Sequence, residues 1–295
     1  MVFLNQMALH IDCVVKGRDL LGECPLWDER AATLWWVDIL APSLQQLQPE
    51  TGAVKRLELV EAMGSFAFCE KAGMLAAMKS GLYFFDPEKN QRLEIAKPET
   101  DLPQNRFNDG RCDRAGRFWA GTMSDPIREP TGALYRLSPD GRCKRMLTRI
   151  TVPNSLAWSP DGRSMYFADS PRRKIWIFDY DGASGEPSKE RLFATTYPGY
   201  PDGSCVDAEG CLWNAEYASG RVVRYTPDGK IDRLIELPVR NPTCCCFGGE
   251  RLDTLYITTA AQGLKEADLE KQPLAGSLFA VRPGITGLRE SRFAG

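Results

Sequence analysis

Short apolar stretches alternate with turn sequences along most of the chain. Leu34–Val37, Met74–Ala77 and Phe118–Ala120 are examples of such stretches. Turns that contain glycine lie between them, as at Asp113–Gly116 and Pro160–Gly162. Glycine allows the positive φ that a tight turn requires, and short apolar runs without a 3.6-residue period are typical of strands. The pattern therefore predicts many short strands joined by tight turns.

These strands belong to a unit that repeats six times along the chain. Each unit starts with a polar residue, has a small or apolar residue at its third position and has a large or apolar residue at its fifth. Successive units start 41 to 48 residues apart, and the six starting residues are Glu23, Ser65, Asn108, Asn154, Asp202 and Thr243. A unit of this length with several strands is the period of a propeller blade.

About four short strands fit into each unit, which matches a blade of a β-propeller. We therefore predict an all-β fold, a six-bladed β-propeller with four-stranded antiparallel blades around a central channel, formed by residues 1–295 as a single domain. The N-terminal strand near Leu9–Val15 is expected to complete the last blade. Trp35, Trp36 and Trp119 are expected to lie in the blade cores rather than to stack on a sugar.

Composition excludes several classes of protein. The chain has 295 residues, of which 43% are hydrophobic and 26% are charged, so disorder and coiled coil are excluded. A net charge of −2 gives little electrostatic reason to bind nucleic acid or an anionic membrane. Met1–Gln6 lacks the features of a secretory signal, and no stretch has the length of a transmembrane helix. We expect a cytoplasmic protein that binds neither nucleic acid nor a membrane.

The histidine and cysteine contents restrict the chemistry. His10 is the one histidine and is distant in sequence from every repeated motif, so a Ser-His-Asp or Cys-His nucleophile is not favoured. The ten cysteines lack paired C-x-x-C spacing and include the contiguous run Cys244–Cys246. We interpret them as reduced thiols at small apolar positions. Hydrolysis by this chain would therefore use carboxylates, a metal ion or both.

The polar starts of the six units are expected to form a ring near one mouth of the channel, because equivalent positions of successive blades surround the axis. All six carry oxygen and none is a cation, while Glu23 and Asp202 would balance a divalent ion. Polar residues also commonly end strands and cap turns. Acids or amides nevertheless occupy this position in four of the six units. The pattern predicts a divalent-metal site at the channel mouth.

Several blocks of sequence resemble the gluconolactonase/regucalcin (senescence-marker-protein) family over nearly the full chain. The blocks stand in the family's order: Gly22–Trp27, Asn105–Gly110 followed by Gly116–Met123, Val152–Trp158, and Tyr200–Gly203 with Asp207–Gly210. The resemblance implies a six-bladed propeller, in agreement with the repeat count. It also implies one divalent metal in the channel and, for many members, hydrolysis of sugar lactones.

The resemblance further implies roles for individual residues. Glu23, Asn154 and Asp202 match the metal ligands, and Asp202 also matches the family's proposed general base. Arg106 and Asn108 match the residues that hold the substrate, with Asn108 close to the metal.

We therefore expect a divalent-metal-dependent lactonase that hydrolyses a gluconolactone-, arabinonolactone- or xylonolactone-like sugar lactone. The metal would polarise the carbonyl and Asp202 would assist attack by water. Its identity stays open among Ca, Mg, Mn, Zn and Fe. Two alternatives are another metal-dependent propeller esterase or phosphotriesterase, and a non-enzymatic calcium-binding regulator. A protein-interaction propeller without metal is a third.

Several loop residues receive no role from the sequence. The loop after the Gly-Thr-Met motif contains Asp125 and Glu129 and departs from relatives that place a sugar-contacting acid there. Arg172 and Arg173 could meet an anionic substituent of the substrate, although a solvated loop is the simpler interpretation. Lys265–Glu270 is expected to form a short exposed helix.

Overall fold

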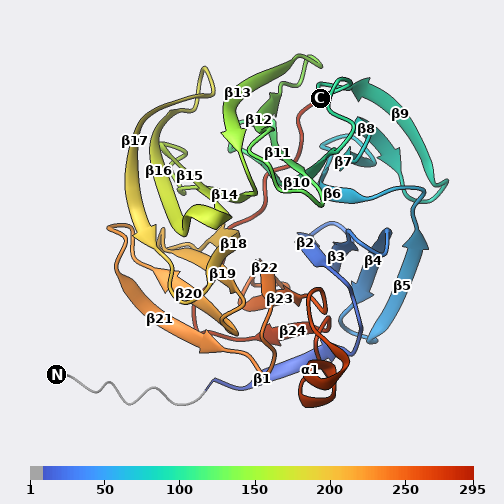
Figure 1. Cartoon of the computed structure of the whole chain (residues 1–295), viewed down its shortest axis with the longest axis vertical. Coiled ribbons are helices and arrows are strands. Elements are labelled where there is room, and N and C mark those ends of the chain that lie inside the picture. Colours follow the sequence, from blue (N-terminus) through green and yellow to red (C-terminus); the bar gives the residue numbers. More distant parts are fainter. Residues whose placement is uncertain (1–8) are drawn as a thin grey trace.

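The computed structural model describes residues 9–295, which form six four-stranded antiparallel sheets arranged as blades in a ring (Figure 1). The innermost strand of each blade contacts the innermost strands of both neighbouring blades, so the ring closes around a channel. The predicted six-bladed β-propeller is confirmed. Met1–Gln6, which the sequence analysis interpreted as lacking a secretory signal, lies outside the described part of the chain.

In the first three blades the chain runs from the channel to the rim, so sequence order is also spatial order. Blade 1 consists of β2 (Gly22–Asp28), β3 (Thr33–Asp38), β4 (Ser43–Gln48) and β5 (Ala53–Glu58). Blade 2 consists of β6 (Met63–Phe68), β7 (Met74–Met78), β8 (Gly81–Asp86) and β9 (Gln91–Ala96). Blade 3 consists of β10 (Asn105–Cys112), β11 (Phe118–Ser124), β12 (Gly132–Leu137) and β13 (Cys143–Ile150).

Blades 4 and 5 repeat this order, with a 3₁₀ helix, η1 (Ser170–Arg172), after the second strand of blade 4. Blade 4 consists of β14 (Pro153–Trp158), β15 (Ser164–Asp169), β16 (Lys174–Asp181) and β17 (Glu186–Thr195). Blade 5 consists of β18 (Tyr200–Val206), β19 (Leu212–Tyr217), β20 (Arg221–Tyr225) and β21 (Ile231–Glu236).

Blade 6 combines strands from the two ends of the chain. Its inner strands are β22 (Pro242–Gly248), β23 (Thr254–Thr259) and β24 (Leu278–Val281), and its outer strand is β1 (Ile11–Val15). β1 pairs with β24 in antiparallel register, with Ile11 opposite Val281. The strand predicted near Leu9–Val15 therefore completes the last blade.

Apolar side chains fill the spaces within and between the blades. Trp36 and Trp119 are 1% and 0% exposed, as expected for core residues. The rings of Trp119 in blade 3 and Trp158 in blade 4 lie 5.9 Å apart between centroids. Complete burial of one large apolar side chain stabilises a fold by about 1.5–3 kcal/mol. These contacts fix the blades relative to one another and so hold the channel walls in place.

A buried aspartate organises the first turn of blades 3 and 5. The Oδ1 atom of Asp113 accepts hydrogen bonds from the backbone amides of Ala115 and Arg117 at 2.9 and 3.0 Å. In the corresponding turn of blade 5, Asp207 accepts a hydrogen bond from Trp213 Nε1 at 2.8 Å. Both aspartates have no exposed surface. Each turn thereby ties the innermost strand of its blade to the second strand.

The C-terminal segment after β24 crosses the channel at the end where the innermost strands finish. Ala208 in blade 5 donates a backbone hydrogen bond to Thr286 at 3.0 Å. Near the C-terminus, Phe293 donates to Phe68 of blade 2 at 2.8 Å and is 1% exposed. Figure 1 shows this segment in red, ending at the point marked C. It closes one end of the channel, opposite the ends where the innermost strands begin.

The helix α1 (Glu266–Lys271) lies between β23 and β24 and has no buried residue. It is the short exposed helix expected from Lys265–Glu270. In the described part of the chain, no helix combines the length and the hydropathy needed to cross a membrane.

Candidate active site

A cavity of about 300 Å³ lies at the channel end where the innermost strands begin. Glu23, Arg106, Asn108, Asn154 and Asp202 all line it. They come from four innermost strands, β2, β10, β14 and β18. The structure therefore brings together all five residues that the sequence singled out.

The other two polar starts, Ser65 and Thr243, do not line this cavity. Thr243 Oγ1 donates a hydrogen bond to the Gly22 carbonyl and lies 2.9 Å from Thr258 Oγ1. Ser65 is fully buried, and its hydroxyl has no hydrogen-bond partner within residues 9–295. The expectation of a six-membered ring is therefore wrong at these two positions, because both short hydroxyl side chains are buried in the strand layer beside the cavity.

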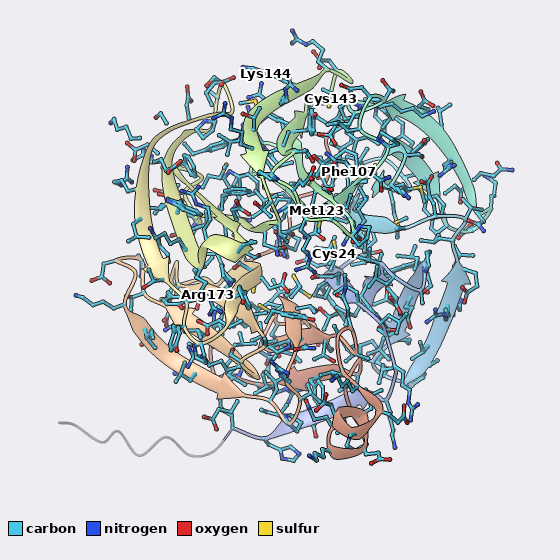
Figure 2. The ribbon with its side chains drawn as sticks, in the orientation of Figure 1. Cys24, Phe107, Met123, Cys143, Lys144 and Arg173 are labelled. Carbon is cyan, nitrogen blue, oxygen red and sulfur yellow. The ribbon has the colours of Figure 1, made fainter. Side chains whose placement is uncertain are left out.

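The strands that carry the site are irregular at the functional positions. The antiparallel register shifts immediately after Glu23 in β2 and after Asn154 in β14. The next residues, Cys24 and Ser155, have φ values of 48° and 64°, in the left-handed region that non-glycine residues seldom adopt. A β-bulge re-aims a side chain at a strand end. Cys24 lies near the centre of the ring, whereas Lys144 lies at the rim (Figure 2).

Two buried carboxyl groups face each other in the cavity. Glu23 and Asp202 are 8% and 7% exposed and lie within hydrogen-bonding reach of one another. Burial, followed by repulsion from Asp109, raises the pKa of Glu23 to about 8. Burial, followed by repulsion from Glu23, raises the pKa of Asp202 well above its ordinary range. Such a pair either shares a proton or requires a cation beside it.

A chain of hydrogen bonds fixes the amide groups next to these carboxyls. Arg106 Nη1 donates to Asn108 Oδ1 at 2.9 Å, and Asn108 Nδ2 donates to Asn154 Oδ1 at 3.1 Å. Asn154 Nδ2 in turn donates to Ser170 Oγ at 2.8 Å. Ser170 donates onward to the Pro201 carbonyl at 2.6 Å. The chain leaves one lone pair of the Asn154 amide oxygen unused.

The guanidinium group of Arg106 is held on one side and free on the other. Its Nε donates to Asp125 Oδ2 at 2.5 Å and its Nη1 donates to the Phe107 carbonyl at 3.0 Å. Its Nη2 has no hydrogen-bond partner among the described residues. Asp125, to which the sequence gave no role, therefore orients Arg106 so that free N–H groups remain for a ligand.

The rest of the cavity wall lies outside the repeated register. Arg128 comes from the loop after β11, Gln262 from the loop after β23, and Tyr200 and Tyr217 from blade 5. Met123, also in the wall, lies near the centre of the ring in Figure 2. Sequence reasoning missed these residues because it followed the one repeated position. The unusual loop after the Gly-Thr-Met motif was the available signal for Arg128.

Arg172 and Arg173 do not line the cavity. The Arg172 guanidinium carbon lies 4.4 Å from the ring centroid of Trp176, and that of Arg173 lies 3.9 Å from the ring centroid of Tyr200. Arg172 is exposed, whereas Arg173 is half-buried and donates from Nη1 to the carbonyls of Pro198 and, at 2.9 Å, of Gly199. Arg172 therefore agrees with the interpretation of a solvated loop, whereas Arg173 is held against the segment that precedes β18.

The donor set of the cavity suits a hard divalent cation. Within residues 9–295, no group of three or more His, Cys, Asp or Glu side chains is placed to hold a metal. The cavity instead combines the carboxylates of Glu23 and Asp202 with the amide oxygen of Asn154. Oxygen atoms of these types are the ligands that Ca²⁺ and Mg²⁺ prefer. A cation beside the two carboxylates would also relieve their repulsion, so the residues present fit such an ion.

A larger cavity, of about 560 Å³, lies at the opposite end of the channel beside the C-terminal segment. Its charged side chains are largely paired with one another. Arg30 pairs with Glu70 at 2.7 Å, and Arg289 pairs with Glu29 at 3.3 Å. Because these charges already have partners, this cavity is the weaker candidate for a ligand.

Comparisons with known proteins place the chain in a family. Residues 21–261 match the family model described as "SMP-30/Gluconolactonase/LRE-like region". The chain is 40% identical to the 6-deoxy-6-sulfogluconolactonase of Pseudomonas putida, over 97% of this chain and 99% of that protein. It is 35% identical to the regucalcin of Xenopus laevis, over 98% and 99%. The crystal structure of a calcium-binding protein, regucalcin, from Agrobacterium tumefaciens superimposes with a TM-score of 0.94, 30% identity and 98% coverage of both chains. The chain therefore belongs to the SMP-30/gluconolactonase family, as its sequence motifs implied.

Proposed function

We propose that this protein is a divalent-metal-dependent sugar lactonase that hydrolyses an aldonolactone to its aldonic acid. The observation that carries the proposal is the buried carboxyl pair of Glu23 and Asp202 beside the free N–H groups of Arg106 in one cavity. The reaction class is that of a carboxylic-ester hydrolase, in agreement with the lactonase among its relatives. That relative's name adds a sulfonated gluconolactone to the gluconolactone-, arabinonolactone- and xylonolactone-like candidates.

Glu23, Asn154 and Asp202 would hold the cation. Their oxygen atoms suit Ca²⁺, Mg²⁺ or Mn²⁺, and Zn²⁺ and Fe²⁺ are the further candidates. When bound, the cation supplies positive charge toward the lactone carbonyl oxygen, where negative charge develops during attack. It would also favour the ionised forms of both carboxyl groups, in opposition to the effect of their burial.

Two side chains of the protein act on the reacting atoms in this proposal. Arg106 donates hydrogen bonds from Nη2 to the oxygen atoms of the lactone, because a guanidinium group remains charged at all working pH values. Asp202 takes the proton of water as the water oxygen bonds to the carbonyl carbon. The ring C–O bond then breaks, and the leaving oxygen takes this proton from Asp202 to become a hydroxyl of the aldonic acid. General-base assistance of this kind contributes about 10²–10⁴-fold to the rate.

A calcium-binding protein without turnover would use the same carboxylates and is the second candidate, because one relative of known structure is described as calcium-binding. A cation alone has no use for hydrogen-bond donors, so the free Nη2 of Arg106 favours an organic ligand. Esters with large apolar groups are disfavoured because four charged side chains, Glu23, Arg106, Arg128 and Asp202, line the cavity.

The test is acid release from a panel of aldonolactones by protein that has been treated with chelator and then resupplied with single metal ions. We expect the rate to fall to the spontaneous level after chelation and to return with at least one ion. Thermal unfolding is measured in parallel, because an ion that binds only the folded protein raises its stability. Glu23→Gln should lose both the rate and the metal-induced rise in melting temperature.

Full activity after chelation would contradict the metal requirement. A metal-induced rise in melting temperature without hydrolysis of any lactone would favour the calcium-binding alternative. Hydrolysis confined to aryl esters or phosphotriesters would replace the proposed substrate class.

A further inference from the structure

Arg128 is the one charged wall residue of the cavity that has no partner among the described residues. The charged side chains of the wall are two carboxylates, Glu23 and Asp202, and two guanidinium groups, Arg106 and Arg128. Arg106 is paired with Asp125. Arg128 makes neither an ion pair nor a side-chain hydrogen bond within residues 9–295, although its side chain reaches the cavity.

The loop that carries Arg128 is anchored where it leaves β11. The backbone N–H of Arg128 donates to the Ser124 carbonyl at 3.1 Å, and Arg128 has a φ of 59°. This left-handed residue turns the chain back toward the blade. The loop therefore presents the guanidinium at the cavity from blade 3.

Exposure places Arg128 nearer the mouth of the cavity than Glu23 and Asp202, which are 8% and 7% exposed. Its charge acts on the Tyr217 hydroxyl of blade 5, where it opposes burial and the charge of Asp202, which both raise the pKa of that tyrosine. Arg106, by contrast, acts on Glu23. The side chain of Arg128 is also exposed, as expected for a residue at the mouth.

The charges of the occupied cavity then leave one excess positive charge. A divalent cation would balance Glu23 and Asp202, and Asp125 balances Arg106, so Arg128 would be the one charged wall residue left without a counter-charge. The carboxylate that hydrolysis creates arises at the carbonyl carbon, which in the proposed mechanism is the end of the lactone that faces Glu23 and Asp202. A neutral lactone would therefore leave Arg128 without a partner, whereas an anionic group at the other end of the lactone would meet it.

We propose that Arg128 selects lactones that carry an anionic group at the end remote from the carbonyl, such as a phosphate or a sulfonate. This inference rests on the proposed lactonase function and narrows its substrate class. A guanidinium group binds such oxyanions through two parallel hydrogen bonds, which gives direction as well as charge. Since Arg128 is exposed, we expect a preference of about tenfold, which falls as salt is added.

The experiment compares kcat/KM for D-glucono-1,5-lactone with that for the same lactone bearing a 6-phosphate or a 6-sulfonate. We expect the unmodified protein to prefer both anionic lactones by about tenfold. Arg128→Gln should abolish the preference through a much larger loss of kcat/KM on the anionic lactones than on the neutral one, while Arg128→Lys should keep part of the preference. Arg172→Gln is the matched control, because it removes an exposed guanidinium from the adjacent loop outside the cavity.

Equal kcat/KM values on neutral and anionic lactones, or an equal loss on both in Arg128→Gln, would overturn the inference. A preference for only one of the two anionic groups would still support the role of Arg128 and would show whether the group is a phosphate or a sulfonate. If no lactone is hydrolysed, the proposed function fails. The role of Arg128 is then tested separately by measuring the binding of the corresponding acids. Calorimetry should then show 6-phosphogluconate binding more tightly than gluconate, with the difference lost in Arg128→Gln. Equal binding of the two acids would overturn the inference there.

Discussion

The two ends of the channel use the same kinds of side chain in opposite ways. At the closed end, Arg111 of β10 points a buried guanidinium at Glu290 of the C-terminal segment, and the two form an ion pair. Burial alone would lower the pKa of Arg111, but Glu290 raises it well above its ordinary value. At the open end, Glu23 and Asp202 are buried against each other. Burial is the main cause that raises the pKa of both, followed by repulsion from Asp109 for Glu23 and from Glu23 for Asp202.

This difference in charge pairing distinguishes a structural role at the closed end from a chemical role at the open end. Opposite charges that form an ion pair inside a protein compensate each other, and breaking the pair destabilises the contact between the two segments. Like charges held side by side lack a counter-charge. They stay close together only because the surrounding blades fix the strands that carry them. Perturbed carboxyl groups in a cavity are a recognised sign of a functional site. The open end is therefore the candidate binding site, whereas the charges at the closed end serve to hold the structure together.

The largest expected effect is at the open end. Asp202→Asn removes the proposed base and one charged ligand, so we expect the lactonase rate to fall by about 10²–10⁴-fold. The stability of the fold should not decrease, because a buried carboxylate beside another is costly to ionise. Acid release and the urea midpoint are measured together. Glu250→Gln, an exposed carboxylate beyond the far end of β22, is the control. A variant that retained half of the wild-type rate would remove Asp202 from the mechanism.

A smaller effect is expected at the closed end, and on stability rather than rate. Glu290→Gln leaves the buried Arg111 without its counter-charge, which should lower the free energy of unfolding by about 3 kcal/mol. The kcat/KM of the folded protein should stay near the wild-type value. Glu29→Gln is the matched control, because its partner Arg289 is 83% exposed and such pairs contribute less than about 1 kcal/mol. Loss of activity without loss of stability in Glu290→Gln would break the contrast between the two ends.

The smallest expected effect concerns Asp19, a buried carboxyl outside both ends. It accepts hydrogen bonds from Trp36 at 2.8 Å and Gln45 at 2.9 Å, and burial raises its pKa to about 6. Between its unfolded pKa of 3.8 and about 6, the folded protein holds the extra proton. Its contribution to stability is therefore present below pH 3.8 and is lost as the pH rises through about 6.

We expect this loss to be roughly 2 kcal/mol and to be smaller in Asp19→Asn. The measurement is the difference in unfolding free energy between pH 4.5 and 7.5 for the two proteins. Glu50→Gln, at an exposed turn, should leave the wild-type dependence unchanged. An Asp19→Asn variant with the full wild-type pH dependence would show that other carboxyl groups cause it.

The fold could be predicted from the sequence because each blade of a propeller repeats the same local pattern of strands and turns. Turn glycines and short apolar runs recur with each blade, and equivalent positions in a ring have equivalent surroundings. The same logic located Glu23, Asn108, Asn154 and Asp202, whose common register puts them at one mouth. Asp125 and Arg128 were not assigned because they lie in a loop between blade strands, where no repeat constrains the chain.

Two further features had no local signal. The left-handed backbone of Cys24 and Ser155 cannot be inferred from residue types that seldom adopt it. The C-terminal segment crosses the channel through bonds with residues as distant in sequence as Phe68, and it carries no periodicity. Ser65 and Thr243 show the converse, since a shared register position did not place their short side chains in the cavity.

The pairing of β1 with β24 makes completion of the ring depend on the order in which the chain is synthesised. All four residues of β24 are buried, and β1 covers its outer edge. Because β1 is synthesised before β24, β1 has no partner in its blade until β24 has been made. Until β1 pairs with it, the outer edge of β24 is an unpaired strand edge, which is the situation that leads to strand exchange and aggregation. The five residues Ile11–Val15 therefore supply the strand that covers this edge in the completed ring.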